Sequence, residues 1–262
     1  MTAVGERVPG HLRGIADQVV AAAEADERLL AVIAGGSVAT GTSDEYSDLD
    51  LVLVCTPEAQ AECLAEAPEF AGRIGPFLAG FTGEHVGEPR LLITLFGPPL
   101  THVDLKYVTP DDLRKRVEDG VVLWQRGDVV DRAHAESAAH WPAPDPQWIE
   151  DRFWVWVHYV AVKIGRGELF EAIDGLGMLR SAAIAPLATL GRTARPAGVR
   201  RLETLAPELV PELRQTVATA DRDDCLRALK VSVELYRTVR ESSGVQVVRR
   251  TSAEEAVVAF LG

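Results

Sequence analysis

The segment from Ala34 to Val54, AGGSVATGTSDEYSDLDLVLV, constrains this chain more than any other part of it. It places Asp48 and Asp50 in a run of leucine and valine that has the composition of a buried strand. Side chains at i and i+2 of a strand point to the same side, so the two carboxylates share one face and the leucines face the other. Like charges in a half-buried position are costly unless a cation neutralises them, so the pattern predicts a divalent-cation site.

A glycine-rich turn precedes these carboxylates. Gly35 and Gly36 are followed by Ser37, and ten residues separate Ser37 from Asp48. A helix that opens at such a turn presents N–H groups to phosphate oxygens, and glycine lets the backbone come close to a ligand. Either feature alone would fit a helix cap or an ordinary strand, whereas both at this spacing favour a site for phosphate and metal.

A proline-rich stretch from His140 to Trp148, HWPAPDPQW, predicts a linker because prolines this dense end a helix and favour extended backbone. We therefore expect one domain over residues 1–140 and a second over residues 141–262. The chain of 262 residues is 47% hydrophobic and 25% charged, which is ordinary for globular domains of this size.

The first domain mixes short apolar strands with helices, which predicts an α+β fold around a small antiparallel or mixed sheet. We expect its strands at residues 29–35, 49–55, 90–97, 102–108 and, from a weaker pattern, 121–128. We expect its helices at residues 11–25, 58–67 and 110–120.

The second domain is predicted to be helical throughout. Buried positions at helical spacing favour helices over residues 148–167, 168–191, 225–244 and 252–262, with Pro186 kinking or ending the second of them.

The net charge of −12 lies entirely in the first domain. Residues 1–140 contain 23 acidic and 11 basic side chains, and the remaining residues contain 16 of each. An acidic domain repels phosphate backbones and attracts cations, so nucleic acid is a poor candidate partner and a polycationic small molecule is a good one. Acidic surfaces also serve solubility, and charge alone does not decide between these explanations.

The cysteines and the hydropathy pattern point to the cytoplasm. Cys55, Cys63 and Cys225 form neither an even framework nor a metal-type pair, as expected of thiols in a reducing compartment. The N-terminal stretch has no apolar segment after basic residues, and no apolar run approaches the length of a membrane span. We expect a cytoplasmic protein without membrane contact.

The segment GGSVATGTSDEYSDLDLVLV resembles the signature of nucleotidyltransferases related to DNA polymerase β. That signature has a Gly-Ser turn, about ten intervening residues, and Asp-x-Asp within a hydrophobic strand. Ala39, Gly41 and Ser47 also agree with it, whereas Thr40 stands where many members have arginine. The resemblance implies a polymerase-β-like domain followed by a helical domain, with the active site in the cleft between them.

The resemblance also implies roles for these residues. Asp48 and Asp50 would hold two Mg²⁺ ions that bridge to the triphosphate of ATP, and Gly36, Ser37 and Ser47 would contact the nucleotide.

The resemblance also places a third carboxylate on a strand that neighbours the Asp-x-Asp strand. Asp104 is the best candidate because it is embedded in the apolar segment HVDLKYV, and it would bind metal and take the proton of the attacking hydroxyl. The alternative is a plain ion pair with Lys106. Glu84 and Glu88, in the glycine-rich stretch GFTGEHVGEPR, are the second choice as bases, and a flexible acidic loop there could receive a cationic substrate.

In the second domain, a set of basic and aromatic side chains repeats at 4-3-4-3 spacing and so shares one helix face. Antibiotic-modifying relatives use a basic residue from such a helix to hold the triphosphate. Lys163 is our first candidate and Arg166 the second, although solvated charges would give the same pattern. The set is Arg152, Trp156, Tyr159, Lys163 and Arg166.

The resemblance, to aminoglycoside and lincosamide adenylyltransferases in particular, implies transfer of AMP from ATP to a hydroxyl of a small molecule, by a monomer or a homodimer. The acidic first domain favours a small cationic antibiotic such as an aminoglycoside as the acceptor. A lincosamide or another small molecule is an alternative acceptor, and a protein or RNA acceptor, as in toxin–antitoxin nucleotidyltransferases, is less favoured. Metal-dependent glycosyltransferases share Asp-x-Asp without the Gly-Ser turn. A regulatory nucleotide-binding module would have little need of three carboxylates.

Overall fold

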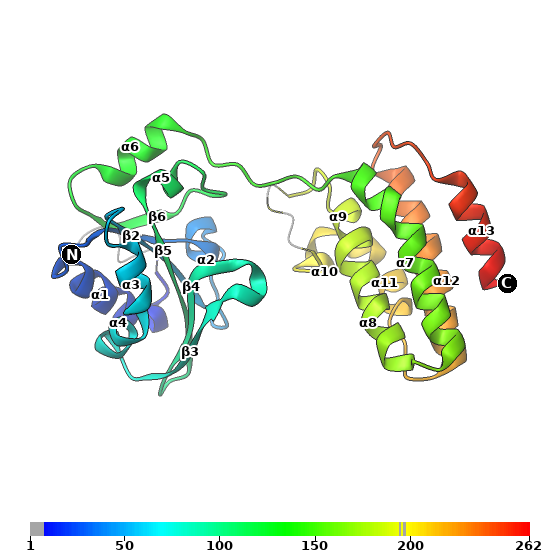
Figure 1. Cartoon of the computed structure of the whole chain (residues 1–262), viewed down its shortest axis with the longest axis horizontal. Helices are drawn as coiled ribbons and strands as arrows, with labels where there is room; N and C mark the ends of the chain where they lie inside the picture. The colour runs from blue at the N-terminus through cyan, green and yellow to red at the C-terminus, as the bar shows by residue number, and fades with distance from the viewer. Residues whose placement is uncertain (1–7, 194, 196–197) are drawn as a thin grey trace. The chain divides into compact units, whose positions relative to one another are not determined.

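The computed structural model describes residues 8–193, 195 and 198–262. The chain divides into two compact units, the first ending at Trp141 and the second spanning Pro142–Gly262. The first unit combines a sheet with helices and the second is helical, which confirms the predicted α+β fold class (Figure 1). Within the described part of the chain, no helix has both the length and the hydropathy needed to cross a membrane.

The first unit is built on a six-stranded sheet with strand order β3-β4-β5-β2-β1-β6. Strands β2 and β5 pair in parallel, and every other neighbouring pair is antiparallel, so the sheet is mixed, as predicted. The strands are β1 (Leu29–Ala34), β2 (Leu49–Cys55), β3 (Phe77–Gly83), β4 (Glu88–Phe96), β5 (Thr101–Val108) and β6 (Val121–Gln125).

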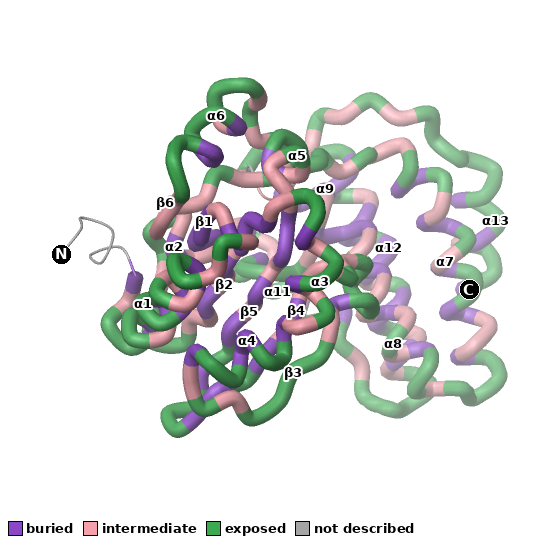
Figure 2. The backbone as a smooth tube through the Cα atoms, turned by 60° about the vertical axis from the view of Figure 1, so that its left-hand side comes forward, coloured by how far each residue is buried: buried purple, intermediate pink, exposed green. Residues whose placement is uncertain are grey.

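Helices cover this sheet on both faces. The helices α1 (Gly10–Glu24), α3 (Gln60–Ala65) and α4 (Ala67–Ile74) contribute to one hydrophobic core. A smaller core on the other face includes side chains of α5 (Pro110–Leu113) and α6 (Val129–Glu136). The buried stretches of the tube in Figure 2 follow the central strands between these two cores.

Strand β2 shows the alternation that the sequence predicted. Leu49, Leu51 and Leu53 are at most 1% exposed and belong to the larger core, while Asp50 and Val52 are only partly buried. The apolar face is held against α1, α3 and α4, and this leaves the carboxylate on the opposite face.

Two predictions about the first unit were wrong. The stretch around Glu84 is no flexible loop, because β3, a 3-10 turn (Glu84–Val86) and β4 run through it as a hairpin. Strand β3 was not predicted because its glycines are typical of a loop. Its side chains are also mostly exposed, so the sequence lacks the apolar pattern of a buried strand. The helix expected over residues 110–120 ends at Leu113, after a capping box between Thr109 and Asp112.

The second unit is a helical bundle whose long first helix is α7 (Pro146–Arg166). Asp145 caps it by accepting bonds from the N–H groups of Gln147 and Trp148, and Pro146 occupies the first helical position, where no N–H is needed. The predicted buried stripe is confirmed, because all five of its members are at most 3% exposed. They are Ile149, Phe153, Val157, Val160 and Ile164.

The helices α8 (Leu169–Leu179), α12 (Arg222–Ser242) and α13 (Thr251–Leu261) pack against α7. The expected second helix is α8 (Leu169–Leu179), followed by a π-helical turn (Arg180–Ile184) and the short α9 (Ala185–Ala188), which contains Pro186. The helices α10 (Leu202–Leu205) and α11 (Val210–Gln215) were not predicted. The last two are α12 (Arg222–Ser242) and α13 (Thr251–Leu261).

Candidate active site

Two of the three predicted catalytic carboxylates are neighbours in the sheet. Asp50 on β2 is the register partner of Asp104 on β5, in the one parallel strand pair of the described chain. Both side chains are partly buried and lie on the sheet face opposite the larger core. Asp48 immediately precedes β2, and its charge acts on Asp104. The three carboxylates are therefore gathered at one end of two paired strands.

The electrostatics of Asp104 reflect this crowding. Burial raises the pKa of Asp104, and the negative charge of Asp48 raises it further. A hydrogen bond from His102 opposes this shift, with His102 Nε2 lying 2.9 Å from Asp104 Oδ1. The alternative partner, Lys106, instead pairs with Glu88 at 2.7 Å. Asp104 is thus a carboxylate whose ionised form is disfavoured by its surroundings.

The glycine turn lies directly against Asp50. The Gly35 N–H donates to the Asp50 carbonyl at 2.9 Å, which fastens the turn to β2. Gly36 opens α2 (Gly36–Thr40) with a φ of +56°, and a Cβ there would lie 1.8 Å from Asp50 Oδ2. Any larger residue at position 36 would displace that carboxylate, so this glycine is required by both conformation and space.

Glu118 is a part of this site that sequence reasoning missed. Its Oε1 accepts a hydrogen bond of 3.0 Å from the N–H of Gly36, one of the groups predicted to meet phosphate. A triphosphate oxygen that uses this N–H has to replace the Glu118 carboxylate. The contact joins residues 82 positions apart, and no local pattern around Glu118 signals it.

The two predicted nucleotide-binding serines make local bonds in the structure. Ser37 Oγ accepts a bond of 3.0 Å from Ser43. Ser47 Oγ accepts from the N–H of Asp44 at 2.8 Å and donates to its carboxylate, which closes the loop before β2. Their roles toward a nucleotide stay predictions.

Glu88, a predicted substrate contact, is surrounded by cations of its own unit. It pairs with Arg90 and with Lys106, each at 2.7 Å, and Arg90 also pairs with Asp112. The hydrogen bond from Arg90 is the largest effect on Glu88 and lowers its pKa to about 2. Its charge is thus largely neutralised, which weakens it as a receptor for a cationic substrate. Glu84 lies in the 3-10 turn, and a bond from Thr82 lowers its pKa.

Lys163 and Arg166 lie in the last turns of α7, within the second unit. Lys163 Nζ is 2.6 Å from Glu168 and 3.5 Å from Glu171, while Arg166 is 3.9 Å from Glu168. Both candidates are therefore engaged with acids at the junction of α7 and α8. Their contact with a triphosphate stays a prediction.

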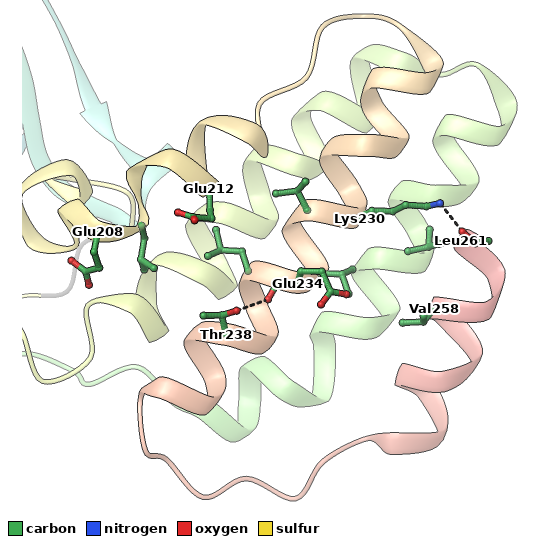
Figure 3. Close-up of a pocket in the computed structure, with 12 residues that line it drawn as sticks. Glu208, Glu212, Lys230, Glu234, Thr238, Val258 and Leu261 are labelled. Atoms are coloured by element: carbon green, nitrogen blue, oxygen red, sulfur yellow. Dashed lines mark hydrogen bonds between the residues drawn. The ribbon is translucent and has the colours of Figure 1, made fainter.

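A pocket of about 490 Å³ occurs in the second unit, between α11, α12 and α13 (Figure 3). Three glutamates lie on it, and two of them are paired, Glu208 with Arg192 and Glu234 with Arg237. None of the predicted site residues lines it. Its apolar lining comes from Leu209, Val231, Val233, Leu235, Val258 and Leu261.

The donor chemistry of Asp48, Asp50 and Asp104 suits Mg²⁺, which prefers carboxylate oxygens. A cation would also relieve the repulsion that raises the pKa of Asp104. Among the residues that the structure describes, however, no three His, Cys, Asp or Glu side chains converge closely enough to hold a metal ion. Asp104 is held at Oδ1 by His102. The residue types fit the ion, and binding requires Asp48 and Asp50 to approach Asp104.

The first unit matches a known class. Residues 17–82 match the family model described as the nucleotidyltransferase domain, a segment that contains the glycine turn, Asp48 and Asp50 and ends before Asp104. This match confirms the resemblance to nucleotidyltransferases of the polymerase β type and supports an enzyme of that class. No curated protein matches the chain.

Two solved structures are similar to the chain as a whole. The first is an aminoglycoside 6-adenyltransferase from Bacillus subtilis, with 14% identity over 94% of this chain and 95% of that one, at a TM-score of 0.42. The second is a nucleotidyltransferase-like protein from Exiguobacterium sibiricum 255-15, with 12% identity over 95% and 78% of the two chains, at a TM-score of 0.39. At TM-scores below 0.5 these likenesses carry no further argument.

Proposed function

We propose that the chain transfers the AMP group of ATP to a hydroxyl of a small cationic antibiotic such as an aminoglycoside, with release of pyrophosphate. The observation that carries this proposal is the pairing of Asp50 with Asp104 across parallel strands, with Asp48 acting on Asp104 and the glycine turn lying against Asp50. The nucleotidyltransferase match over residues 17–82 supports the reaction class.

In the proposed reaction, Asp104 takes the proton of the acceptor hydroxyl, and the hydroxyl oxygen attacks the α-phosphorus of ATP. The bond to the pyrophosphate group breaks as the new ester bond forms. Two Mg²⁺ ions on Asp48, Asp50 and Asp104 would supply neutralisation of the charge on the attacking and leaving oxygens.

The turn at Gly36 and Ser37 is the proposed place for the triphosphate, and Lys163 or Arg166 is proposed to contact it from the second unit. Glu118 now lies on the Gly36 N–H, so nucleotide binding would exchange one anion for another at this donor. Exchange of a carboxylate for a phosphate oxygen keeps the N–H satisfied, which limits the cost of opening the turn.

The acceptor has two candidate classes. The acidic first unit, with 23 acidic and 11 basic side chains in residues 1–140, favours a polycation. The neutralised Glu88 and the exposed apolar side chains of Phe81 and Leu95 on the β3–β4 hairpin favour an acceptor with an apolar part, such as a lincosamide. Both would be modified by the same chemistry.

The test is pyrophosphate release with Mg²⁺ and ATP across a panel of aminoglycosides and lincosamides. We expect release that depends on one acceptor class and vanishes in the Asp50→Asn variant. Tight ATP binding without release across the panel would contradict the proposal and favour another acceptor or a regulatory nucleotide-binding role.

A further inference from the structure

A histidine lies against the proposed catalytic base. His102 and Asp104 are two residues apart on β5, so their side chains are on the same side of the strand. The distance from His102 Nε2 to Asp104 Oδ1 is 2.9 Å, which is a good hydrogen bond. The sequence had given the histidines no role, because none has the spacing of a metal ligand.

The direction of this bond follows from its chemistry. An ionised carboxylate can only accept, so the imidazole nitrogen must be the donor. One oxygen of Asp104 is thereby held in place. The imidazole itself is about half exposed, with 48% of the His102 side chain accessible, whereas 21% of the Asp104 side chain is accessible.

On the neighbouring strand β4, the residues beside the His102–Asp104 hydrogen bond are apolar. In the register of β4 with β5, Ile93 is the partner of Asp104 and Leu95 is the partner of His102. Aliphatic side chains offer no competing donor to the carboxylate. Besides His102, the charged group that acts on Asp104 is the carboxylate of Asp48, and Asp50 is its register partner on β2.

We propose that His102 is a positioning residue for Asp104. The Nε2–H bond holds Oδ1 of Asp104, so that metal and acceptor hydroxyl would meet its Oδ2. The proposal rests on the proposed function of Asp104. Groups that orient a ligating carboxylate in this way typically contribute about 10–100-fold to metal affinity or activity.

The test uses Mn²⁺ as the metal probe, titrated into the full-length chain and followed by electron paramagnetic resonance of the free ion. We expect His102→Ala to weaken Mn²⁺ binding by about 10-fold or more, and His102→Gln, whose amide N–H replaces Nε2–H, to restore most of it. His11→Ala, an exposed histidine on α1, is the matched control and should bind like the unchanged chain. Circular dichroism confirms that each variant is folded.

A double-mutant cycle shows whether His102 acts through Asp104. If it does, His102→Ala adds less than about 2-fold to the loss caused by Asp104→Asn, because the residue to be positioned is already changed. In the assay of nucleotidyl transfer, the single variant His102→Ala should lower kcat and leave the KM of the acceptor unchanged. Equal losses in the alanine and glutamine variants, or additive effects in the cycle, would overturn the proposal.

Failure of the positioning role of His102 can be distinguished from failure of the proposed function. If no acceptor is modified but Mn²⁺ affinity depends on Asp104 and on the His102 donor, the positioning role stands and the acceptor proposal fails. If Asp104→Asn leaves Mn²⁺ affinity unchanged, the positioning role is overturned whatever the transfer assay shows.

Discussion

Each unit of this protein contains a group of buried or partly buried carboxylates, and the effects of their surroundings on the carboxylate pKa values are opposite. In the second unit, Glu150 is 1% exposed and accepts bonds from Tyr236 Oη at 2.5 Å and from Arg240 at 3.1 Å. Glu254 accepts from Arg237, Arg240 and Arg249. Burial alone would raise the pKa of Glu150 and of Glu254, but these donors hold both values below the usual range.

In the first unit, burial and Asp48 raise the pKa of Asp104, and the bond from His102 only opposes this. Carboxylates matched with cations and donors keep their charge inside a fold, whereas a carboxylate whose charged form is disfavoured is a candidate for binding a cation or a proton. One acid group is thus matched by donors and cations, and the other contains an acid, Asp104, whose ionised form is disfavoured, as the proposed function would require of a metal site.

The largest effect that tests this difference between the two units is expected when a carboxylate in the first unit is neutralised. Asp50→Asn should lower nucleotidyl transfer by about 1,000-fold or more, since roughly 4 kcal/mol of barrier stabilisation disappears with the metal ligand. Comparison of its melting temperature with that of the unchanged chain separates a loss of chemistry from a loss of folding. A variant that melts early while retaining transfer would show that Asp50 is structural.

The mirror experiment is Glu150→Gln in the second unit. The change leaves Arg240 without one of its buried partners, and we expect a loss of about 3 kcal/mol in the free energy of unfolding, measured by urea denaturation. Glu234→Gln is the matched control, because its pair with Arg237 is exposed and should contribute at most about 1 kcal/mol. Equal losses in the two variants would contradict the assigned difference.

The contact between the glycine turn and Asp50 gives a third test. Gly36→Ala should reduce transfer by about 100-fold, because its Cβ would meet Asp50 Oδ2 and move a residue placed in the metal site. Gly41→Ala is the control, since Gly41 has a φ of +67° and open space around it. The Gly41→Ala variant has the same kind of backbone strain, about 1 kcal/mol, without a clash between its Cβ and another side chain. Similar loss of transfer in both would assign the effect to strain.

Acid should weaken the second unit through Glu150 and Glu254. Their pKa values are lower in the folded chain than the 4.5 of an unperturbed glutamate, so the stabilisation is complete above about pH 4.5 and declines as the pH falls below it. Thermal melts between pH 7 and pH 3 should show this decline, and Glu150→Gln should flatten it. An unchanged slope in the variant would assign the acid sensitivity to other groups.

The smallest effect concerns the acids proposed to contact substrate. Glu84→Gln should raise the KM of a polycationic acceptor a few-fold, roughly 1 kcal/mol, at low ionic strength. Glu88→Gln should have less effect, because Arg90 and Lys106 already neutralise that carboxylate. Steady-state kinetics with a neutral acceptor provide the control, and a larger effect at Glu88 would contradict its assignment to an internal ion network.

Local patterns predicted much of this structure. The alternation in β2 predicted which face of the strand is buried and that Asp50 lies on the other face. Helical spacing predicted the buried stripe on α7. Both patterns depend on residues close in the sequence. The pairing of Asp50 with Asp104 required the resemblance, since the register of parallel strands is set by packing far along the chain.

The contacts that the sequence did not predict are of two kinds. Glu118 reaches Gly36 over 82 positions and Glu88 reaches Lys106 between strands, so neither is visible in a local pattern. His102 differs, because the period of two on a strand already places it beside Asp104. The hairpin strand β3 was missed since its exposed side chains and glycines resemble a loop.

The central claim is that the carboxylates of the first unit carry out nucleotidyl transfer. The most direct measurement follows the label of ATP marked at either the α- or the γ-phosphate, in the presence of Mg²⁺ and the acceptor selected by the panel. The account predicts that the α-label moves to the acceptor, that the γ-label leaves as pyrophosphate, and that Asp50→Asn and Asp104→Asn stop both. Transfer of the γ-label to the acceptor, or α-label transfer that survives these substitutions, would contradict it.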